Sequence, residues 1–368
     1  MIHFLVPAAH SSLIGDYLDV FGAPLQEKIR VAHYEDLVNR KEFARGTYVL
    51  AALDQLSPGF AGWLFEIHQQ LKDAEGVRFL NHPKHTLQRF GLLSELSQRG
   101  LNEFRAARAG GDGTDLRFPV FLRSERLHEG ALSPLLHSEG EIKQAIGRAL
   151  IQGHKLRELL IIEFCETADD QGYYSKYGAF VVGKRVIPRS LNYGRDWMLK
   201  HSQTEFTMAM VHDELDYVTQ NPHEEQLLKI FELAQVEYGR MDYSIKNGRV
   251  QTWEINLNPT ICRGLRPSTM KLAPEVDAVR ARSRECFFQR FESAWREVEL
   301  PADRHPAIEV NVHTGIIEAA CGNGVEEQQR LLSATRTVLR PVKPIIEPIS
   351  SPFLRALGWL ARLNQSRQ

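Results

Sequence analysis

The feature that most constrains this chain is the run GRMDYSIKNGRVQTWEINLNP, residues 239 to 259. Asn247 and Gly248 form a two-residue turn signal with alternating bulky residues after it, and this pattern predicts a β-hairpin. Glu254 and Asn256 are two residues apart, so their side chains leave the same face of the second strand. Asp242, on the first strand, can lie opposite them. The run therefore predicts three oxygen-bearing side chains gathered on one face of a sheet.

These three side chains have the chemistry of ligands for a divalent metal ion. Mg²⁺ is held by few carboxylates and completes its coordination with water and phosphate oxygens. Two carboxylates and an amide therefore suit a metal-nucleotide complex better than a structural metal site. On hairpin geometry alone, an ordinary amphipathic hairpin with a solvated charged face stays open.

The hairpin resembles the metal-binding end of the ATP-grasp superfamily, in which an aspartate on one strand precedes Glu-x-Asn-x-x-Pro on the next. Here Asp242 is followed by Glu254, Asn256 and Pro259 in that pattern. Arg240, two residues before the aspartate, is similar to the Gly-Arg-x-Asp form of D-alanyl-D-alanine ligases. The resemblance implies ATP and Mg²⁺ as cofactors, with two ions expected and Mn²⁺ as an alternative. It also implies that Asp242, Glu254 and Asn256 are the metal ligands.

The composition is that of an ordinary soluble globular protein, with 43% hydrophobic residues, 25% charged residues and a formal net charge of -1. This charge does not indicate a surface for nucleic acid. The four cysteines are widely spaced and form no CxxC pair, which is typical of reduced thiols in a cytoplasmic protein. The start, MIHFLVPAAH, fits a first strand better than a signal peptide, and no stretch is long and apolar enough to span a bilayer.

Strands separated by helical stretches predict an α/β fold. Strands are expected at residues 2 to 6, 48 to 53, 117 to 125 and 156 to 166, and a hairpin at 177 to 191 that turns at Gly183 and Lys184. Helical patterns cover residues 60 to 75, 84 to 99, 139 to 150 and 224 to 238.

This order of elements resembles the ATP-grasp fold over about residues 1 to 290. The resemblance implies a small N-terminal α/β domain at 1 to 80, an ATP-grasp domain at 81 to 300 with its lid at about 115 to 165, and a C-terminal extension at 301 to 368. It is closest to the ribosomal-protein glutamate ligase type, with Asn81 to Pro83 as the Asn-x-Pro segment. A Walker loop and a GxGxxG motif are both absent, so expected nucleotide binding depends on this resemblance.

Several basic residues are expected at the nucleotide phosphates. The family carries a lysine on the helix after Asn-x-Pro and another on the strand entering the lid, where this chain has Arg89 and Arg123. Arginine binds phosphate through a planar fork instead of a point charge. A third cation of related ligases is replaced by Gly178, and Lys176, on the same strand face, is expected to compensate. Arg189 is a further candidate for the γ-phosphate. A solvated surface cation stays open for each of these basic residues.

The strand LLIIEFC resembles the hinge that lies along the adenine in this family. Glu163, Phe164 and Cys165 match the positions that bond the base edge. The alternative is a buried strand that ends in a surface acid, and in either case Glu163 needs a partner. The connection that follows is longer than usual and leaves three candidates for the ribose-binding acid, namely Glu166, Asp169 and Asp170.

The resemblance implies an enzyme that joins a carboxylate to an amine through an acylphosphate, with release of ADP and phosphate. Arg240 and Arg189 are then the catalytic cations, and Arg263 and Arg266 are expected to clamp a carboxylate or phosphate of the substrate. A small-molecule kinase on the same fold and a non-catalytic nucleotide-binding protein stay open. The carboxylate and amine substrates are not identified, and small molecules and peptides both fit.

The C-terminal extension predicts an amphipathic helix at residues 353 to 363, after a proline-rich stretch. Its apolar face is expected to pack on the same protein or on a second subunit, while weak contact with a membrane surface stays open. A homo-oligomer also stays open.

Overall fold

The computed structural model describes residues 1 to 321, apart from 112–114, 128–129, 200–203, 263–271 and 302–305. The described chain divides into two compact units. Unit 1 combines residues 1–103 with residues 165–321, and unit 2 holds residues 104–164. The mixture of helices and strands confirms the predicted α/β class. The expected limits of the N-terminal domain, the ATP-grasp domain and the C-terminal extension stay predictions, and the helix at 353–363 lies outside the described residues.

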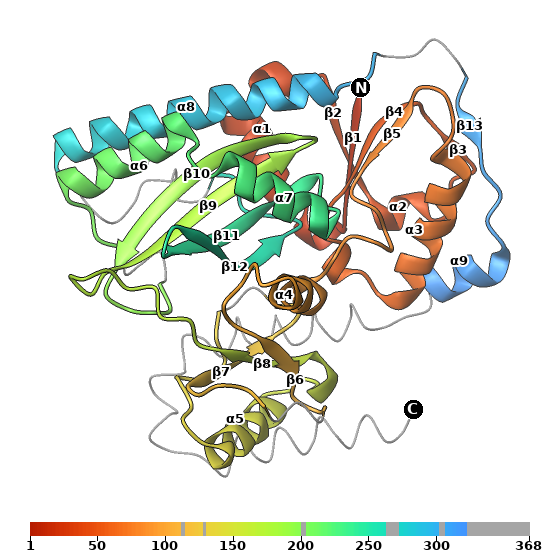
Figure 1. Ribbon diagram of the computed structural model, residues 1–368. Helices are drawn as coiled ribbons and strands as arrows, with labels where there is room; N and C mark the ends of the chain where they lie inside the picture. Colours follow the sequence, from red (N-terminus) through yellow and green to blue (C-terminus); the bar gives the residue numbers. More distant parts are fainter. Residues whose placement is uncertain (112–114, 128–129, 200–203, 263–271, 302–305, 322–368) are drawn as a thin grey trace, which may run out of the picture. The chain divides into compact units, whose positions relative to one another are not determined.

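The first sheet of unit 1 is parallel, in the order β2-β1-β4-β5. Its strands are β1 (Ile2–Val6), β2 (Ile29–His33), β4 (Gly46–Leu50) and β5 (Val77–Leu80). Every residue of β1 and β4 is buried, as expected for central strands covered on both faces. The connecting helices are α1 (Ser12–Val20), α2 (Tyr34–Leu37) and α3 (Pro58–Leu71). Figure 1 shows this sheet and its helices.

Two predicted boundaries in this region shift by a few residues. The strand expected over 48 to 53 ends at Leu50, because Ala52 takes a left-handed conformation with a φ of 55° and the 3₁₀ helix η3 (Leu53–Gln55) follows. The helix expected from residue 60 begins at Pro58. Ser57 caps it, since its side chain accepts a hydrogen bond from the N–H of Phe60.

The second sheet of unit 1 is antiparallel, in the order β10-β9-β11-β12. Its strands are β9 (Tyr174–Val182), β10 (Arg185–Gly194), β11 (Tyr238–Lys246) and β12 (Arg249–Asn256). Both predicted hairpins are present. Asn247 and Gly248 have φ angles of 50° and 74°, the left-handed conformation that a two-residue hairpin turn requires, and Gly183 has a φ of 63°.

Helices α6 (Met208–Gln220) and α8 (Pro274–Val298) pack against each other and against β10 of this sheet (Figure 1). Aromatic side chains fill the core beneath α8, where Phe180 lies 5.1 Å from Phe291 between ring centroids. The same core reaches the parallel sheet, because Phe4 of β1 lies 5.2 Å from Tyr238 of β11. Both sheets of unit 1 therefore share one hydrophobic core.

The helices expected at 84 to 99 and 224 to 238 are α4 (Arg89–Gln98) and α7 (Glu224–Ala234). α7 ends early because Gln235 adopts a left-handed conformation with a φ of 51°. The remaining elements of unit 1 are β3 (Glu42–Phe43), which pairs with β13 (Ile308–Glu309), the 3₁₀ helices η1 (Ala8–His10) and η2 (Ala23–Leu25), and α9 (Thr314–Cys321), which packs against α3.

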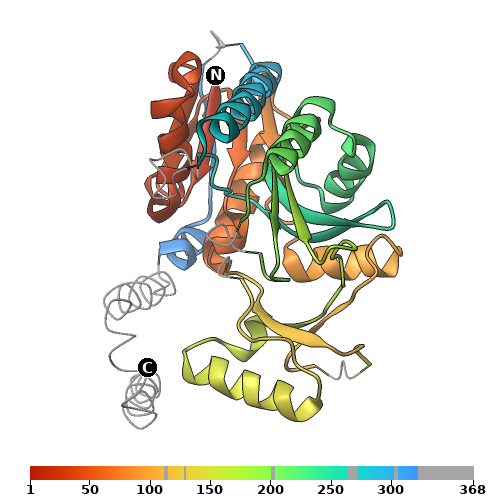
Figure 2. The same ribbon diagram turned by 90° about the vertical axis from the view of Figure 1, so that its left-hand side faces the viewer.

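Unit 2 is a three-stranded antiparallel sheet in the order β6-β8-β7, with one helix on it (Figure 2). Its elements are β6 (Ala106–Arg108), β7 (Val120–Ser124), α5 (Glu139–Ile151), η4 (Leu156–Glu158) and β8 (Leu159–Glu163). Leu122, Leu136 and Leu159 lie in a small core of its own. Ser138 caps α5 by accepting the N–H of Glu141.

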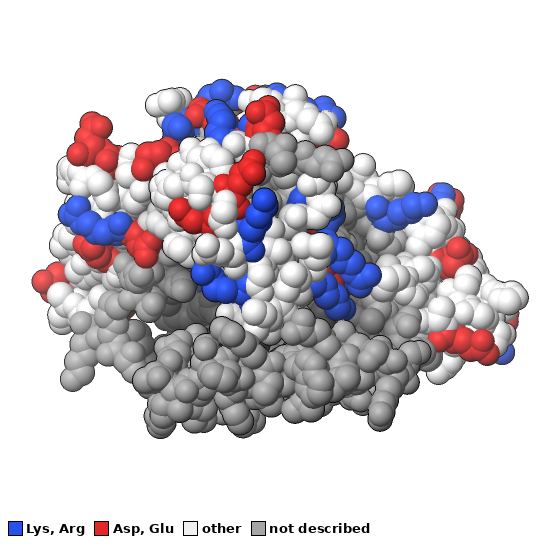
Figure 3. Space-filling view, turned by 90° about the horizontal axis from the view of Figure 1, so that it is seen from below, with Lys and Arg blue, Asp and Glu red and all other residues white. Residues whose placement is uncertain are grey.

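Charged side chains of both signs are interspersed over the described part of the face in Figure 3. None of the described helices combines the length and apolar character that a membrane span requires.

Candidate active site

The predicted oxygen ligands lie together on β11 and β12. Asp242 pairs in register with Glu254, and the next pair along the same face joins Arg240 to Asn256. A register shift follows Asp242, so the regular pairing breaks directly beside the two carboxylates. Asp242 is 3% exposed and Glu254 is 8% exposed. The hairpin therefore holds two carboxylates side by side at a largely buried position.

Three basic side chains neutralise these carboxylates. Arg240 Nε lies 2.8 Å from Asp242 Oδ1, Lys176 Nζ lies 2.9 Å from Asp242 Oδ2, and Arg89 forms an ion pair with Glu254. Burial alone would raise the pKa of Asp242, but the charges of Arg240 and Lys176 outweigh it and hold that pKa below its ordinary value. Two negative and three positive charges leave a local excess of one positive charge.

Lys176 reaches Asp242 from the neighbouring strand β9. Gly178, whose missing cation Lys176 was expected to replace, stands directly opposite Asp242 in the β9–β11 register. A contact of Lys176 with phosphate stays a prediction. A β-carbon on Gly178 would meet Ser190 Oγ at 3.0 Å and Arg240 Cδ at 3.8 Å. The glycine thus avoids a tight contact with Ser190, and the cations at this position come from strands β9 and β11.

Arg89 is the first residue of α4 and is 5% exposed. The segment before it is fixed by Asn81, whose φ is 69°. The Asn81 side chain donates to the carbonyls of Leu50 at 3.0 Å and Tyr238 at 2.8 Å, and it accepts the N–H of Tyr238 at 3.0 Å. The Asn-x-Pro segment therefore ties β4 and β5 to the start of β11, which places Arg89 beside Glu254.

The donor atoms fit a hard divalent cation. Asn256 adds an amide oxygen, which also accepts the N–H of Asn258 at 2.9 Å. Over the described ranges, no group of three or more His, Cys, Asp and Glu side chains could hold a metal ion. A metal ion at this position would therefore need oxygen ligands from a bound molecule besides those of Asp242, Glu254 and Asn256. The excess positive charge of the protein groups favours an anionic partner for such an ion.

Arg189 and Arg240 both contact the loop that follows Pro259. Arg189 lies at the bulge of β10 and donates from Nε and Nη2 to the carbonyl of Ile261, each at 3.4 Å. Arg240 Nη1 donates to the carbonyl of Thr260 at 3.3 Å. Burial lowers the pKa of Arg189 to about 10, so the group stays charged at neutral pH. Arg263 and Arg266, the predicted substrate clamp, lie outside the described residues.

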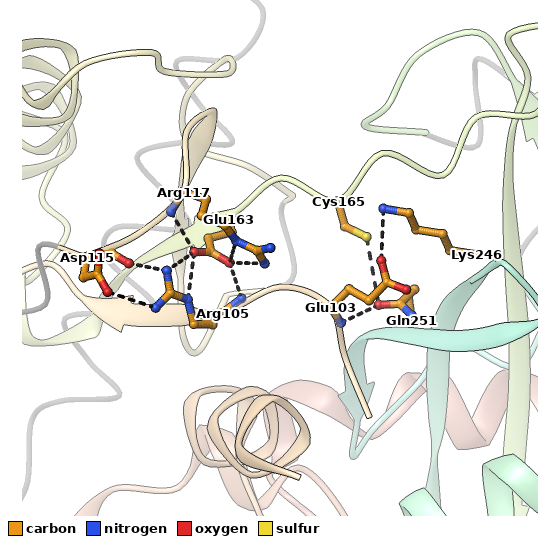
Figure 4. A network of polar contacts seen from close by, with 8 residues as sticks. All are labelled: Glu103, Arg105, Asp115, Arg117, Glu163, Cys165, Lys246 and Gln251. Atoms are coloured by element: carbon orange, nitrogen blue, oxygen red, sulfur yellow. Dashed lines mark hydrogen bonds and ion pairs between the residues drawn. The ribbon is translucent and has the colours of Figure 1, made fainter. Parts of the chain in front are cut away.

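Glu163 lies in unit 2, where it is the centre of an arginine cluster (Figure 4). Its carboxylate, 1% exposed, accepts from the side chains of Arg105 at 2.7 Å and Arg117 at 2.9 Å, and from the backbone N–H groups of both residues. Burial would raise the pKa of Glu163, but these donors lower it to about 2. Any adenine contact, which stays a prediction, would share this carboxylate with two arginines.

The other predicted nucleotide residues fall in different units. Arg123 lies on β7 of unit 2 and is 8% exposed, and the N–H of Phe164 donates to the carbonyl of Pro119 at 2.9 Å in the same unit. Cys165 is buried in unit 1, with its Sγ 3.9 Å from Gln251 Oε1. Their contacts with a nucleotide stay predictions.

Two of the candidate ribose-binding acids have roles within their own loop. Glu166 accepts the hydroxyl of Tyr174 at 3.1 Å, and Asp169 accepts the N–H groups of Gln171 and Tyr173 at 2.9 Å and 2.8 Å. Asp169 therefore stabilises a turn. Beyond this loop, an open cavity of about 510 Å³ is lined by Tyr174, Arg195, Asp196, Trp197 and Glu205.

Sequence reasoning missed the partners that hold the site together. Glu163 was expected to need a partner, but Arg105 and Arg117 are remote in sequence and carry no motif. The contacts of Gln251 with the backbone N–H of Glu103 and of Asn102 with Thr252 were also missed. Both side chains are buried amides, and a polar residue inside an otherwise regular strand pattern was the available signal for Gln251.

Comparisons with known proteins give structural similarities and no sequence match. No family model matches the chain, and no curated protein matches it. Similar solved structures include the ATP complex of D-alanine–D-alanine ligase from Bacillus anthracis, 10% identical with a TM-score of 0.42, over 80% of this chain and 98% of that one. The corresponding ligase from Coxiella burnetii is 10% identical with a TM-score of 0.44, over 81% and 97% of the two chains. An L-amino acid ligase from Bacillus licheniformis is 10% identical with a TM-score of 0.39, over 86% and 76%.

Proposed function

We propose that this chain is an ATP-grasp enzyme that joins a carboxylate to an amine through an acylphosphate and releases ADP and phosphate. The observation that carries the proposal is the register of the hairpin formed by β11 and β12. Asp242 stands opposite Glu254, and basic side chains from three other positions converge on the two carboxylates. This arrangement combines hard oxygen ligands with excess positive charge, which suits the metal complex of a polyphosphate.

Each residue of the site has a proposed task. Asp242, Glu254 and Asn256 would hold Mg²⁺, which when bound neutralises charge on phosphate oxygens. Lys176 and Arg89 hold the two carboxylates in place through their ion pairs and present positive charge toward the phosphates. Arg123 of unit 2, with Glu163, Phe164 and Cys165, would bind the nucleotide.

The reaction then needs positioning and charge more than an acid-base pair. The substrate carboxylate attacks the γ-phosphorus, the bond to the β-γ bridging oxygen breaks, and ADP leaves. The amine attacks the carbonyl carbon of the acylphosphate, loses a proton, and displaces phosphate. Arg240, charged and held by Asp242, can stabilise the tetrahedral oxyanion of this second step. Arg189 is proposed to support the same region of the site.

The direct test is mass spectrometry of a small-metabolite extract incubated with the protein, ATP and Mg²⁺. We expect a new mass equal to two depleted metabolites minus one water, together with ADP. Glu254→Gln is the matched control, since it keeps the side-chain size and removes the negative charge that a metal ion needs. It should lower product formation at least 100-fold, the scale set by loss of about 2.7 kcal/mol of transition-state stabilisation.

Two other results would contradict the ligase. A product heavier than one metabolite by a phosphoryl group would make the chain a small-molecule kinase. Nucleotide binding with no ATP loss over a broad extract would indicate a non-catalytic nucleotide-binding protein.

A further inference from the structure

The chain passes between the two units at two places, from Glu103 to Phe104 and from Phe164 to Cys165. We call residues 102–105 the first linker and residues 163–166 the second linker. Each linker has contacts inside unit 1 at one end and inside unit 2 at the other.

In unit 1, one buried side chain contacts both linkers. Gln251 of β12 is 0% exposed, and its Oε1 accepts the backbone N–H of Glu103 at 2.8 Å and the Sγ–H of Cys165 at 3.9 Å (Figure 4). The first contact has the geometry of a strong hydrogen bond, and the second is a weak sulfur contact. A single carbonyl oxygen thus holds the last residue before unit 2 through a strong hydrogen bond and contacts the first residue after it only weakly.

The first linker is further fixed along the edge of β12. Asn102 donates from its side chain to the carbonyl of Thr252 and accepts the N–H of Thr252, both at 2.9 Å. Lys246 Nζ lies 3.1 Å from Glu103 Oε2 (Figure 4). Because β12 also carries Glu254, the linker is attached to the strand that presents a proposed metal ligand.

In unit 2, Glu163 contacts the other end of the same linkers. It belongs to the second linker, and its carboxylate accepts the backbone N–H of Arg105 at 3.0 Å and the Nε of Arg105 at 2.9 Å. The backbone N–H of Glu163 in turn donates to the carbonyl of Arg105 at 2.9 Å. Residues 105 and 163 are therefore joined to each other within unit 2.

We propose that Gln251 and Glu163 act as two clasps, one in each unit, and that each clasp contacts both linkers where they leave that unit. In unit 2 the carbonyl of Pro119 also accepts the N–H of Phe164, which further fixes the second linker. Gln251 is then a positioning residue for nucleotide binding, a role that rests on the proposed function. By fixing where the first linker leaves unit 1, Gln251 lowers the conformational entropy that the chain loses when nucleotide binds.

Amide hydrogen exchange tests the clasp without any ligand. Gln251→Met removes the acceptor at nearly constant size, so exchange at Glu103 should rise at least 10-fold while exchange at Arg105 stays unchanged. Thr252→Val is the matched control, because it alters a neighbouring residue that is also 0% exposed and leaves the backbone bonds to Asn102 in place. Gln251→Glu keeps an acceptor oxygen and should retain protection at Glu103, which keeps the test decisive if Gln251→Met does not fold.

Unchanged exchange at Glu103 in Gln251→Met would overturn the clasp, and so would an equal rise at Glu103 and Arg105. A second arm measures the dissociation constant of Mg²⁺-ADP by calorimetry, where Gln251→Met should weaken binding about 5-fold and Thr252→Val should not. An equal loss in both variants would overturn the positioning role. If the unaltered protein binds no nucleotide, the proposed function fails, while the exchange result still decides the clasp.

Discussion

At the scale of single residues, several buried carboxylates of this protein form ion pairs with arginines that its sequence did not predict. Asp242, Glu254 and Glu163 are all buried, and each lies against at least one arginine. Removing one partner of such a pair leaves an uncompensated charge and is strongly destabilising. The pairs therefore constrain both stability and the site.

Glu163 gives a pH dependence whose direction follows from its pKa. Because that pKa falls from 4.5 to about 2 on folding, the stabilisation is complete above pH 4.5 and is lost as the pH falls toward 2. The shift corresponds to at most about 3 kcal/mol, and screening of the partly exposed arginines lowers this value. Glu163→Gln should destabilise unit 2 at pH 6 and much less at pH 2.5, as measured by hydrogen exchange of its amides. An equal difference at both pH values would contradict this account.

The placement of the candidate ligand residues could be predicted because strand alternation fixes which side chains share a face. Asp242, Glu254 and Asn256 follow from the turn at Asn247 and a period of two, and the register confirms their juxtaposition. The ion pairs of Glu163 and Glu254 could not be predicted in this way. The arginines in these ion pairs lie 46 to 165 residues away from the two glutamates in the sequence. A local sequence pattern cannot predict contacts between residues so far apart.

At the scale of elements, strong periodicity predicted correctly whether a segment is a helix or a strand. It predicted less well the residues at which the element begins and ends. The two hairpins and helices α3, α4, α5 and α7 were predicted, with the start of α3 displaced to Pro58 and the end of α7 set by the left-handed Gln235. α8 was missed, although it spans 25 residues. Its buried positions include aromatic residues such as Phe287, Phe291 and Trp295, while the helix as a whole is rich in charge, which obscures its apolar face.

The contact between α3 and α9 depends on one glycine. A β-carbon on Gly59 would overlap the carbonyl group of Ala319, so Gly59→Ala should displace α9 from α3. Gly62, on the same helix, has open space around it, and Gly62→Ala should stabilise the helix by up to about 1 kcal/mol. Limited proteolysis would measure the displacement of α9. We expect faster cleavage within residues 314–321 only for Gly59→Ala. Equal cleavage of the two variants would refute the close contact.

At the scale of the whole molecule, the two units should differ in stability. Unit 2 has a small separate core, and small domains bury a lower fraction of their surface. Leu122 is 0% exposed in that core, so Leu122→Ala should cost about 2–5 kcal/mol. Hydrogen exchange should then rise throughout residues 104–164 and stay low in β9, β10 and β11. Leu156→Ala, at a position 43% exposed, is the control, and global unfolding by Leu122→Ala would show that the units are not independent.

The division of unit 1 into two chain segments has a consequence for its biosynthesis. β1 is translated more than two hundred residues before Tyr238 and Trp295, whose rings pack against Phe4. The apolar parallel sheet therefore keeps part of its surface uncovered while residues 104–164 of unit 2 are translated. We expect a chaperone that acts on the nascent chain to bind this uncovered surface.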